Sequence, residues 1–253
     1  MTDALRIVHC SDIHLDGDVH GLGPHEGLGL NGDTGDFYRA AFAAALADMR
    51  AHDPDLMLLA GDLFDANTAS VGTIQWAMET LGQLPFPVVM IPGNHDCMQD
   101  DAIYRRHDFN SIPNVRLLAA PAGEIAFLPE LGVAAWGKGM VEHSPRYSPL
   151  GGCPERPAGC RWYLGLGHGL FVPHRGETDR SSPIHMREIE ASACDYLALG
   201  HHHAAMELVT GKATAAYSGS PTDTIGRGAT YVVVDLADGR APVVAVHTIA
   251  RGG

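Results

Sequence analysis

Eight short apolar runs, separated by helical or irregular stretches, constrain the fold of this chain more than any other feature. Each run has the length of a β-strand, and most lack the apolar–polar alternation of a strand with one wet face. They therefore predict strands that are buried on both faces. The runs cover residues 5–10, 55–61, 87–93, 132–137, 162–167, 195–200, 230–236 and 242–248.

Helical patterns lie between these runs. The alanine-rich stretch 36–52 predicts one helix, the apolar spacing within residues 74–81 predicts a second, and residues 182–193 predict a third. Strands and helices in this order favour a layered α/β or α/β/α architecture with right-handed crossovers. Because 45% of the 253 residues are hydrophobic, we expect one sizeable core and a single domain over residues 1–253.

Two long segments fit neither pattern. Residues 16–36 are rich in glycine, and residues 137–161 combine glycine, proline, arginine and two cysteines without periodicity. Long irregular loops in a compact domain are usually functional. The first segment directly follows a polar motif, so we expect it to shape access to a site there.

Polar side chains that can bind metals follow five of the predicted strands. In an open α/β sheet, ligands bind at the carboxyl ends of the strands. A single Asp or His in such a place is usually a turn or surface residue, but the joint pattern indicates one shared site. The motifs are D-x-H at 12–14, G-D-x-x-D at 61–65, G-N-H-D at 93–96, G-H at 167–168 and G-H-x-H at 200–203.

The residue types in these motifs indicate a particular chemistry. Asp, Asn and His together supply oxygen and nitrogen ligands, which suit Mn²⁺, Fe²⁺ or Zn²⁺ rather than a soft thiolate-bound metal. Two such ions about 3.5–4 Å apart can share a carboxylate, bind a phosphoryl oxygen and generate a hydroxide nucleophile near neutral pH. The motif set therefore predicts metal-assisted hydrolysis of phosphoesters.

These motifs resemble the calcineurin-like metallophosphoesterase superfamily, and the resemblance spans residues 12–203. It implies a layered α/β/α fold with central mixed β-sheets flanked by helices, and two divalent cations. The implied ligands of one cation are Asp12, His14 and His203, and those of the other are Asn94, His168 and His201. Asp62 is implied to bridge the two cations. His95 would protonate the leaving oxygen, with Asp96 orienting it.

The three adjacent histidines at 201–203 are expected to differ in role. In an extended segment, alternate side chains project to opposite sides. His201 and His203 can therefore face the metals together while His202 points away.

Within the superfamily, the motifs are most similar to those of SbcD-type DNA repair exonucleases. The stretches that carry this similarity are CSDIHLDG, LLAGDLFD, IPGNHD, DYLALGHHH and YSGSP at 217–221. The similarity implies a DNA substrate and Mn²⁺ as the metal. SbcD-type subunits also carry a DNA-capping domain and a segment that docks an SbcC-type ATPase. The resemblance covers the catalytic domain only, so that partner stays open.

Charge leaves the substrate open. Thirty acidic and seventeen basic residues give a formal charge of −13, which repels a phosphate backbone unless cations or a local basic patch compensate. A small phosphodiester, such as a cyclic nucleotide or nucleotide conjugate, is therefore the alternative substrate. A noncatalytic metal-binding scaffold is the third hypothesis. Arginines that could contact flanking phosphates, or could simply be solvated, are Arg105, Arg106, Arg146, Arg156, Arg161, Arg175 and Arg180.

The sequence also bears on location and on the thiols. No basic leader with an apolar stretch begins the chain, and no run approaches a membrane span, so we expect a cytoplasmic protein without a membrane partner. Five cysteines without a C-x-x-C pair predict free thiols, although Cys153 and Cys160 could pair under oxidation. The oligomeric state, the physiological metal and endo- or exonuclease action do not follow from the sequence.

Overall fold

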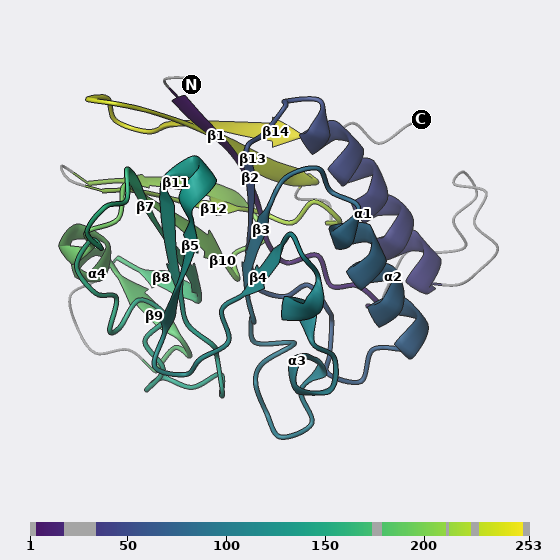
Figure 1. Cartoon of the computed structure of the whole chain (residues 1–253). Coiled ribbons are helices and arrows are strands. Elements are labelled where there is room, and N and C mark those ends of the chain that lie inside the picture. The colour runs from purple at the N-terminus through teal and green to yellow at the C-terminus, as the bar shows by residue number, and fades with distance from the viewer. Residues whose placement is uncertain (1–3, 18–33, 174–178, 211–212, 224–227, 250–253) are drawn as a thin grey trace.

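The computed structural model describes residues 4–17, 34–173, 179–210, 213–223 and 228–249. Two six-stranded sheets pack against each other, and helices cover their outer faces (Figure 1). The expected α/β fold with central mixed sheets flanked by helices is confirmed. Within the described ranges, no helix is long and apolar enough to cross a membrane.

The first sheet has the strand order β14-β13-β1-β2-β3-β4. Strands β1 to β4 run parallel, and β13 pairs with β1 in the antiparallel sense. The strands are β1 (Ala4–Cys10), β2 (Leu56–Ala60), β3 (Val88–Ile91), β4 (Val115–Leu117), β13 (Thr230–Ala237) and β14 (Val243–Thr248).

The second sheet has the order β11-β12-β10-β7-β6-β5. Its four central strands are parallel, and both edge strands are antiparallel to their neighbours. The strands are β5 (Glu124–Leu128), β6 (Val133–Gly137), β7 (Trp162–His168), β10 (Tyr196–Gly200), β11 (Ala205–Val209) and β12 (Thr214–Ser218). A parallel pair, β8 (Leu170–Val172) and β9 (Pro183–His185), stands apart from both sheets.

Helices α1 (Thr34–Arg50) and α2 (Val71–Gly82) cover the outer face of the first sheet, and α4 (Met186–Ala191) lies beside the second (Figure 1). The short helix α3 (Ile103–Arg106) and two 3₁₀ turns, at Phe109–Ser111 and Pro129–Leu131, lie in the connections. The layers explain why the apolar runs lack alternation, because both faces of the central strands are covered.

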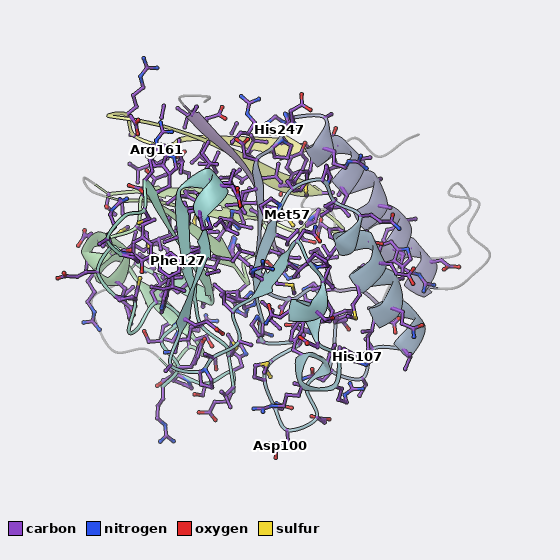
Figure 2. All side chains as sticks on the ribbon, viewed as in Figure 1. Met57, Asp100, His107, Phe127, Arg161 and His247 are labelled. Carbon is purple, nitrogen blue, oxygen red and sulfur yellow. The ribbon has the colours of Figure 1, made fainter. Side chains whose placement is uncertain are left out.

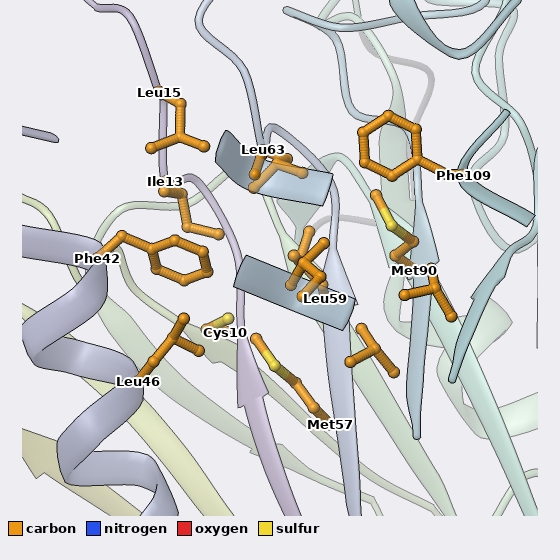
Figure 3. Close-up of a cluster of buried hydrophobic side chains, with 14 of the residues drawn as sticks. Cys10, Ile13, Leu15, Phe42, Leu46, Met57, Leu59, Leu63, Met90 and Phe109 are labelled. Atoms are coloured by element: carbon orange, nitrogen blue, oxygen red, sulfur yellow. The ribbon is translucent and has the colours of Figure 1, made fainter. Parts of the chain in front are cut away.

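Strand β2 illustrates this double burial. Leu56 and Leu58 belong to the core between the two sheets, together with Leu164 of β7. Met57 and Leu59 point the other way and join Phe42 of α1 in the outer core (Figure 3). Every residue of β2 is therefore buried.

One polar pair connects the two sheets. His9 of β1 lies within 2.8 Å of the Tyr196 hydroxyl of β10, measured from its Nδ1 atom, and both side chains are fully buried. Burial lowers the pKa of His9 to about 3, so the imidazole is neutral at physiological pH. A neutral ring with a hydrogen-bond partner is the form of histidine that a dry interior accepts.

The expected strands all form, whereas the third predicted helix is partly wrong. Its first half, Pro183–His185, is strand β9, and only residues 186–191 are helical. Glu188 accepts a hydrogen bond from the backbone N–H of His185 at 2.8 Å, which fixes the helix start at Met186. Strands β4, β5, β8, β9, β11 and β12 were not predicted.

The two irregular segments differ in what the structure describes. Most of residues 16–36 lie outside the described residues, so the expected role in access stays a prediction. The other segment runs from the end of β6 at Gly137 to the start of β7 at Trp162 without a helix or strand. It is held in place locally, since the carbonyl of Met140 accepts from the Met98 N–H at 2.6 Å.

Candidate metal centre

The carboxyl ends of five parallel strands, from both sheets, meet at one place. Strands β1, β2 and β3 come from the first sheet, and β7 and β10 come from the second. The seven predicted metal ligands all lie on or just after these ends, and the structure brings them together. They are Asp12, His14, Asp62, Asn94, His168, His201 and His203.

The first group comprises Asp12, His14 and His203. The Nε2 atoms of the two histidines lie 3.2 Å apart, and the His203 Nε2 lies 3.6 Å from Asp12 Oδ1. His14 donates its Nδ1–H to the Asp65 carboxylate at 3.1 Å. That bond leaves the Nε2 lone pair of His14 pointing into the group, as in ligand histidines of metal sites.

The second group comprises Asn94, His168 and His201. The Oδ1 of Asn94 lies 3.0 Å from His168 Nε2 and 2.7 Å from His201 Nδ1. His168 donates its Nδ1–H to the carbonyl of Ala60 at 2.8 Å, which again directs the Nε2 lone pair into the group.

Asp62 lies between the two groups. Its Oδ2 is 3.2 Å from His168 Nε2 and 3.9 Å from His14 Nε2, and its Oδ1 accepts from the backbone N–H of His95 at 2.8 Å. Burial alone would raise the pKa of Asp62, but the neighbouring imidazole of His168 outweighs it and holds that pKa below its usual range. The carboxylate in turn raises the pKa of His168 to about 9, against the opposing effect of burial.

The donor set fits two divalent cations. Nitrogen and oxygen ligands about 2.0–2.2 Å from one transition-metal ion are separated from each other by roughly 2.9–3.5 Å. The contacts between His14 and His203, and between Asn94 and His168, fall in this range. Asp62 has an oxygen near a histidine of each group, and the Asp12 carboxylate, near His203, also lies within 4.8 Å of the second-group residue His168. The residues present can therefore hold a metal pair.

The glycines of the motifs permit this crowding. A Cβ at Gly93 would lie 2.1 Å from Asp62 Oδ1, and one at Gly61 would lie 2.3 Å from His168 Nδ1. Gly61 also has a positive φ of 92°, which favours glycine. The ligand residues Asp12, His14 and Asp62 adopt left-handed backbone conformations as well, a strain that often marks functional sites.

His95 lies beside the first group, and its surroundings differ from the prediction. Its ring is 4.5 Å from that of His14, between centroids, and its Nδ1 donates to the backbone carbonyl of Asp65 at 2.7 Å. Its side chain is 41% exposed, so a substrate can reach it. The main chain of Asp65, rather than Asp96, orients this imidazole.

Asp96 instead fixes the loops that carry the ligands. Its fully buried carboxylate accepts from the backbone N–H groups of Gly93, Leu63 and Phe64 and from the Tyr104 hydroxyl, at 2.6–3.2 Å. The family resemblance implied a direct contact with His95. The carboxylate points the other way because it satisfies the buried turns after β2 and β3.

The sequence assigned no role to two further residues of the site. Asp65 contacts His14 through its carboxylate and His95 through its carbonyl, and the three residues form another cluster of ligand-capable atoms. Its place in G-D-x-x-D was the available signal. His143, from the irregular loop, packs its ring 5.1 Å from that of His201. Nothing in the local sequence marks it.

The side chain of His202 points away from the metal ligands that His201 and His203 contact. Its ring packs 5.6 Å from that of Tyr217, and its Nδ1 donates to the Ala204 carbonyl at 2.8 Å. His201 and His203 meanwhile contact Asn94 and His14. The roles match the expectation, but the segment is a bend rather than an extended strand, because His201 has a positive φ of 95°.

A pocket opens beside the first ligand group and His95. Side chains from α1, from the loop after β2 and from the segment after β12 line it together with the histidines. The lining residues are His14, Tyr38, Asp65, His95, His203, Ser220, Thr222 and Asp223. A substrate group next to the scissile bond would lie among hydroxyls and carboxylates here.

Several candidate arginines are used elsewhere. Arg156 pairs with Asp195, and Arg161 pairs with Asp238 and lies over the ring of Trp162. Figure 2 shows Arg161 at the end of the molecule opposite to Asp100 and His107, which follow the third metal motif. Of the two possibilities left open for these arginines, contact with flanking phosphates is therefore not supported, since both guanidinium groups are held in ion pairs.

Arg105 and Arg106 lie nearer to the site. They donate to backbone carbonyls in the loops after β2 and β3, and these bonds occupy part of each guanidinium. Arg175 lies outside the described residues.

Comparison with known proteins agrees with this geometry. The family model of calcineurin-like phosphoesterases matches residues 5–205, so the chain belongs to that family. It is 27% identical over 233 residues to the metallophosphoesterase YhaO of Bacillus subtilis (strain 168). That alignment covers 87% of this chain but only 53% of YhaO, so the chain spans about half the length of this curated relative.

Solved structures share the fold at low identity. A dimetal phosphatase from Danio rerio has a TM-score of 0.62 at 10% identity, covering 97% of this chain and 96% of that one. GAP50, the anchor in the inner membrane complex of Plasmodium, has a TM-score of 0.55 at 11% identity, with coverage of 99% and 86%. An archaeal phosphodiesterase has a TM-score of 0.50 at 11% identity, with coverage of 96% and 100%. These neighbours support the fold.

Proposed function

We propose that this chain is a two-metal phosphodiesterase that hydrolyses nucleic acid, specifically DNA. The observation that carries the proposal is the pair of ligand groups joined by Asp62 at the carboxyl ends of five strands. Asp12, His14 and His203 would hold one cation, and Asn94, His168 and His201 the other. Mn²⁺ is the metal that we expect, on the resemblance to SbcD-type nucleases.

The protein's own residues would divide the work around this metal pair. When bound, two such cations would neutralise phosphoryl oxygens and activate water for attack. Asp62 keeps the two ligand groups in register, because its two oxygens contact His168 and the main chain of His95. His95 is exposed and oriented by the Asp65 carbonyl, so it would hydrogen-bond the phosphoryl group and protonate the leaving oxygen.

Support for DNA as the substrate comes from the motif set. The YSGSP segment at 217–221, which adds most to the SbcD-type resemblance, contains Ser220 of the pocket and directly precedes Thr222, which also lines it. If the likeness extends to the complete SbcD-type system, an SbcC-type ATPase would be the protein partner.

A small phosphodiester is the second candidate, and the arginine pairs favour it. Arg156 and Arg161 are engaged with Asp195 and Asp238, while the pocket carries Asp65. Together with a formal charge of −13, this surface repels the flanking phosphates of a polymer. A nucleotide-sized diester presents fewer charges outside the metal pair.

The deciding experiment compares three substrates. Mn²⁺-loaded protein is incubated with end-labelled single-stranded DNA, double-stranded DNA and a small chromogenic phosphodiester, beside His95→Asn and the control His202→Ala. Cleavage of DNA by wild type and His202→Ala, with loss in His95→Asn, supports the nuclease. Cleavage of the small diester alone would contradict the nuclease and support a phosphodiesterase of nucleotide-sized substrates. Stoichiometric metal without any hydrolysis would identify a noncatalytic scaffold.

A further inference from the structure

The YSGSP segment at 217–221 carries part of the SbcD-type similarity, but none of the metal ligands or the proposed acid lies in it. It ends strand β12, the parallel neighbour of β10, and so reaches the metal centre from the same side as His201 and His203. Its two serines, Ser218 and Ser220, are buried. Buried hydroxyls need hydrogen-bond partners. One partner of the Ser218 hydroxyl is Ser11, which itself contacts the metal ligand Asp12.

Ser218 and Ser11 form a chain of hydrogen bonds to Asp12. The Ser11 hydroxyl donates to Asp12 Oδ2 at 2.5 Å, and the Ser11 and Ser218 Oγ atoms lie 2.9 Å apart. A serine has one hydroxyl proton. Since Ser11 gives its proton to the carboxylate, Ser218 is the available donor in the contact with Ser11, and its hydroxyl lies at the same distance, 2.9 Å, from the Gly219 carbonyl. All three side chains are fully buried.

The Asp12 carboxylate is held from a second side as well. Its oxygens accept from the backbone N–H of His201 at 3.0 and 3.1 Å. The serine chain and the His201 main chain together leave Asp12 Oδ1 directed toward His203. The orientation of this ligand is thus set by residues more than 180 positions away in the sequence.

Tyr217 of the segment, and Thr222 directly after it, support neighbouring ligands. The Tyr217 hydroxyl donates to the carbonyl of Gly169, next to His168, at 2.8 Å. The Thr222 hydroxyl donates to the carbonyl of Ile13, between Asp12 and His14, at 2.7 Å. The segment and the residue after it therefore contact loops that carry ligands of both groups.

We propose that Ser218, acting through Ser11, is a positioning residue that sets the affinity of the first ligand group for its cation. The proposal rests on the metal centre of the proposed function. Hydrogen bonds to a ligating side chain fix its orientation, and their removal typically weakens metal binding by about 10–100-fold. Ser11 contacts the carboxylate directly, so its loss should cost more than that of Ser218.

Calorimetric titration of the metal-free protein with Mn²⁺ tests this relay. The variants are Ser11→Ala, Ser218→Ala and the double variant, with Ser182→Ala as a control that removes another fully buried serine hydroxyl. Ser11→Ala should weaken one of two Mn²⁺ sites by about 10–100-fold. Ser218→Ala should weaken the same site by less, and the double variant should match Ser11→Ala because both act through one chain.

Melting temperatures of the metal-free variants separate positioning from stability. All three single variants should lose a similar, small amount of thermal stability, and Ser182→Ala should keep wild-type Mn²⁺ affinity. Wild-type affinity in Ser218→Ala, or additive losses in the double variant, would overturn the relay alone. A wild-type protein that binds no Mn²⁺ would overturn the metal centre and the relay together.

A separate observation concerns a pair of cysteines on the outer side of the second sheet. The Sγ atoms of Cys153, in the loop before β7, and Cys194, just before β10, lie 3.9 Å apart. Cys153 is half-buried and Cys194 is buried. Hydrogen bonds from Cys194 and from Tyr163 lower the pKa of Cys153 to about 7, whereas the pKa of Cys194 is raised.

We infer that Cys153 and Cys194 are a site of thiol–disulfide exchange with small-molecule disulfides. The Cys153 thiolate attacks one sulfur of the small disulfide, whose S–S bond breaks and releases one thiol. Cys194 then loses its proton and attacks the Cys153 sulfur, which forms the protein disulfide and releases the second thiol. The partner suggested by the sequence, Cys160, instead points its Sγ at the Pro157 carbonyl, 3.1 Å away.

Peptide mapping without reduction, after treatment with oxidised glutathione, tests this pair. Wild type and Cys160→Ser should both yield the cross-linked peptides of Cys153 and Cys194, and Cys153→Ser should yield none. A cross-link that contains Cys160, or mixed disulfides that persist on Cys153 in the wild type, would overturn the inference.

Discussion

The substitution Gly93→Ala should disable the metal centre while leaving most of the fold intact. The added Cβ would lie 2.1 Å from Asp62 Oδ1 and 2.5 Å from the Asp62 backbone nitrogen. A side-chain oxygen could rotate away, but the backbone nitrogen cannot. One of the two loops must therefore shift, and Asp62, which lies between both ligand groups, shifts with it.

The size of the effect follows from these distances. Real Cβ atoms essentially never approach other atoms closer than 3.0 Å, so relief requires a displacement of at least about 0.5 Å from the Asp62 backbone nitrogen and about 0.9 Å from Oδ1. A 1 Å misplacement of catalytic geometry can cost about 100-fold in rate, and overpacking of this kind costs about 1–3 kcal/mol of stability. We expect the rate of hydrolysis to fall at least about 100-fold. The free energy of unfolding should fall by only about 1–3 kcal/mol, so most of the protein stays folded.

Hydrolysis of a small chromogenic diester, Mn²⁺ stoichiometry and urea unfolding measure the three consequences. The matched control is Gly72→Ala on α2, where a Cβ meets nothing within 4 Å. That change should keep full activity and stabilise the helix by about 0.5–1 kcal/mol. If Gly93→Ala binds two Mn²⁺ and hydrolyses the diester at the wild-type rate, the proposed crowding around Asp62 is wrong.

Four further expectations concern the core and the site. Tyr196→Phe should lower the free energy of unfolding in urea by about 1–3 kcal/mol, because it removes the partner of buried His9; no loss would contradict that bond. The pKa of His9 is about 3 in the folded protein and 6.5 in the unfolded chain, so the unfolded chain takes up the proton first as the pH falls. The free energy of unfolding should therefore fall as the pH drops from 6.5 towards 3, and His9→Leu should flatten this trend. Chelation should lower the melting temperature, since Mn²⁺ at 100 times its Kd contributes about 2.7 kcal/mol; an unchanged value would argue against specific binding. His201→Ala should lose metal in elemental analysis while His202→Ala retains it, and equal loss would refute the assignment of these histidines.

The strands and the ligand positions could be predicted because they depend on local pattern. Leu56–Ala60 is apolar throughout and followed by Gly61 and Asp62, which marks a buried strand and its carboxyl end. Within each sheet, parallel strands place their carboxyl ends at the same edge, so the ligands carried by that sheet converge. The short edge strands β5 and β11 lacked such a signal, because their exposed residues interrupt the apolar pattern.

The supporting contacts could not be predicted because they depend on side-chain direction and on distant loops. Asp96 follows His95 directly, yet its carboxylate turns to Gly93 and the loop after β2. Ser218 meets Ser11 across 207 positions of the sequence. His143 reaches His201 only through the path of a loop without regular structure. Each contact is set by tertiary packing rather than by spacing.

Electron paramagnetic resonance of the Mn²⁺-loaded protein would test the metal pair and its shared carboxylate. Asp62 lies within reach of a histidine from each ligand group, so wild type should bind two Mn²⁺ per chain and give the spectrum of a magnetically coupled pair. Asp62→Asn should lose that coupling together with hydrolysis of the chromogenic diester. A single uncoupled Mn²⁺ per wild-type chain, or a coupled pair that survives in Asp62→Asn, would contradict a metal pair bridged by Asp62.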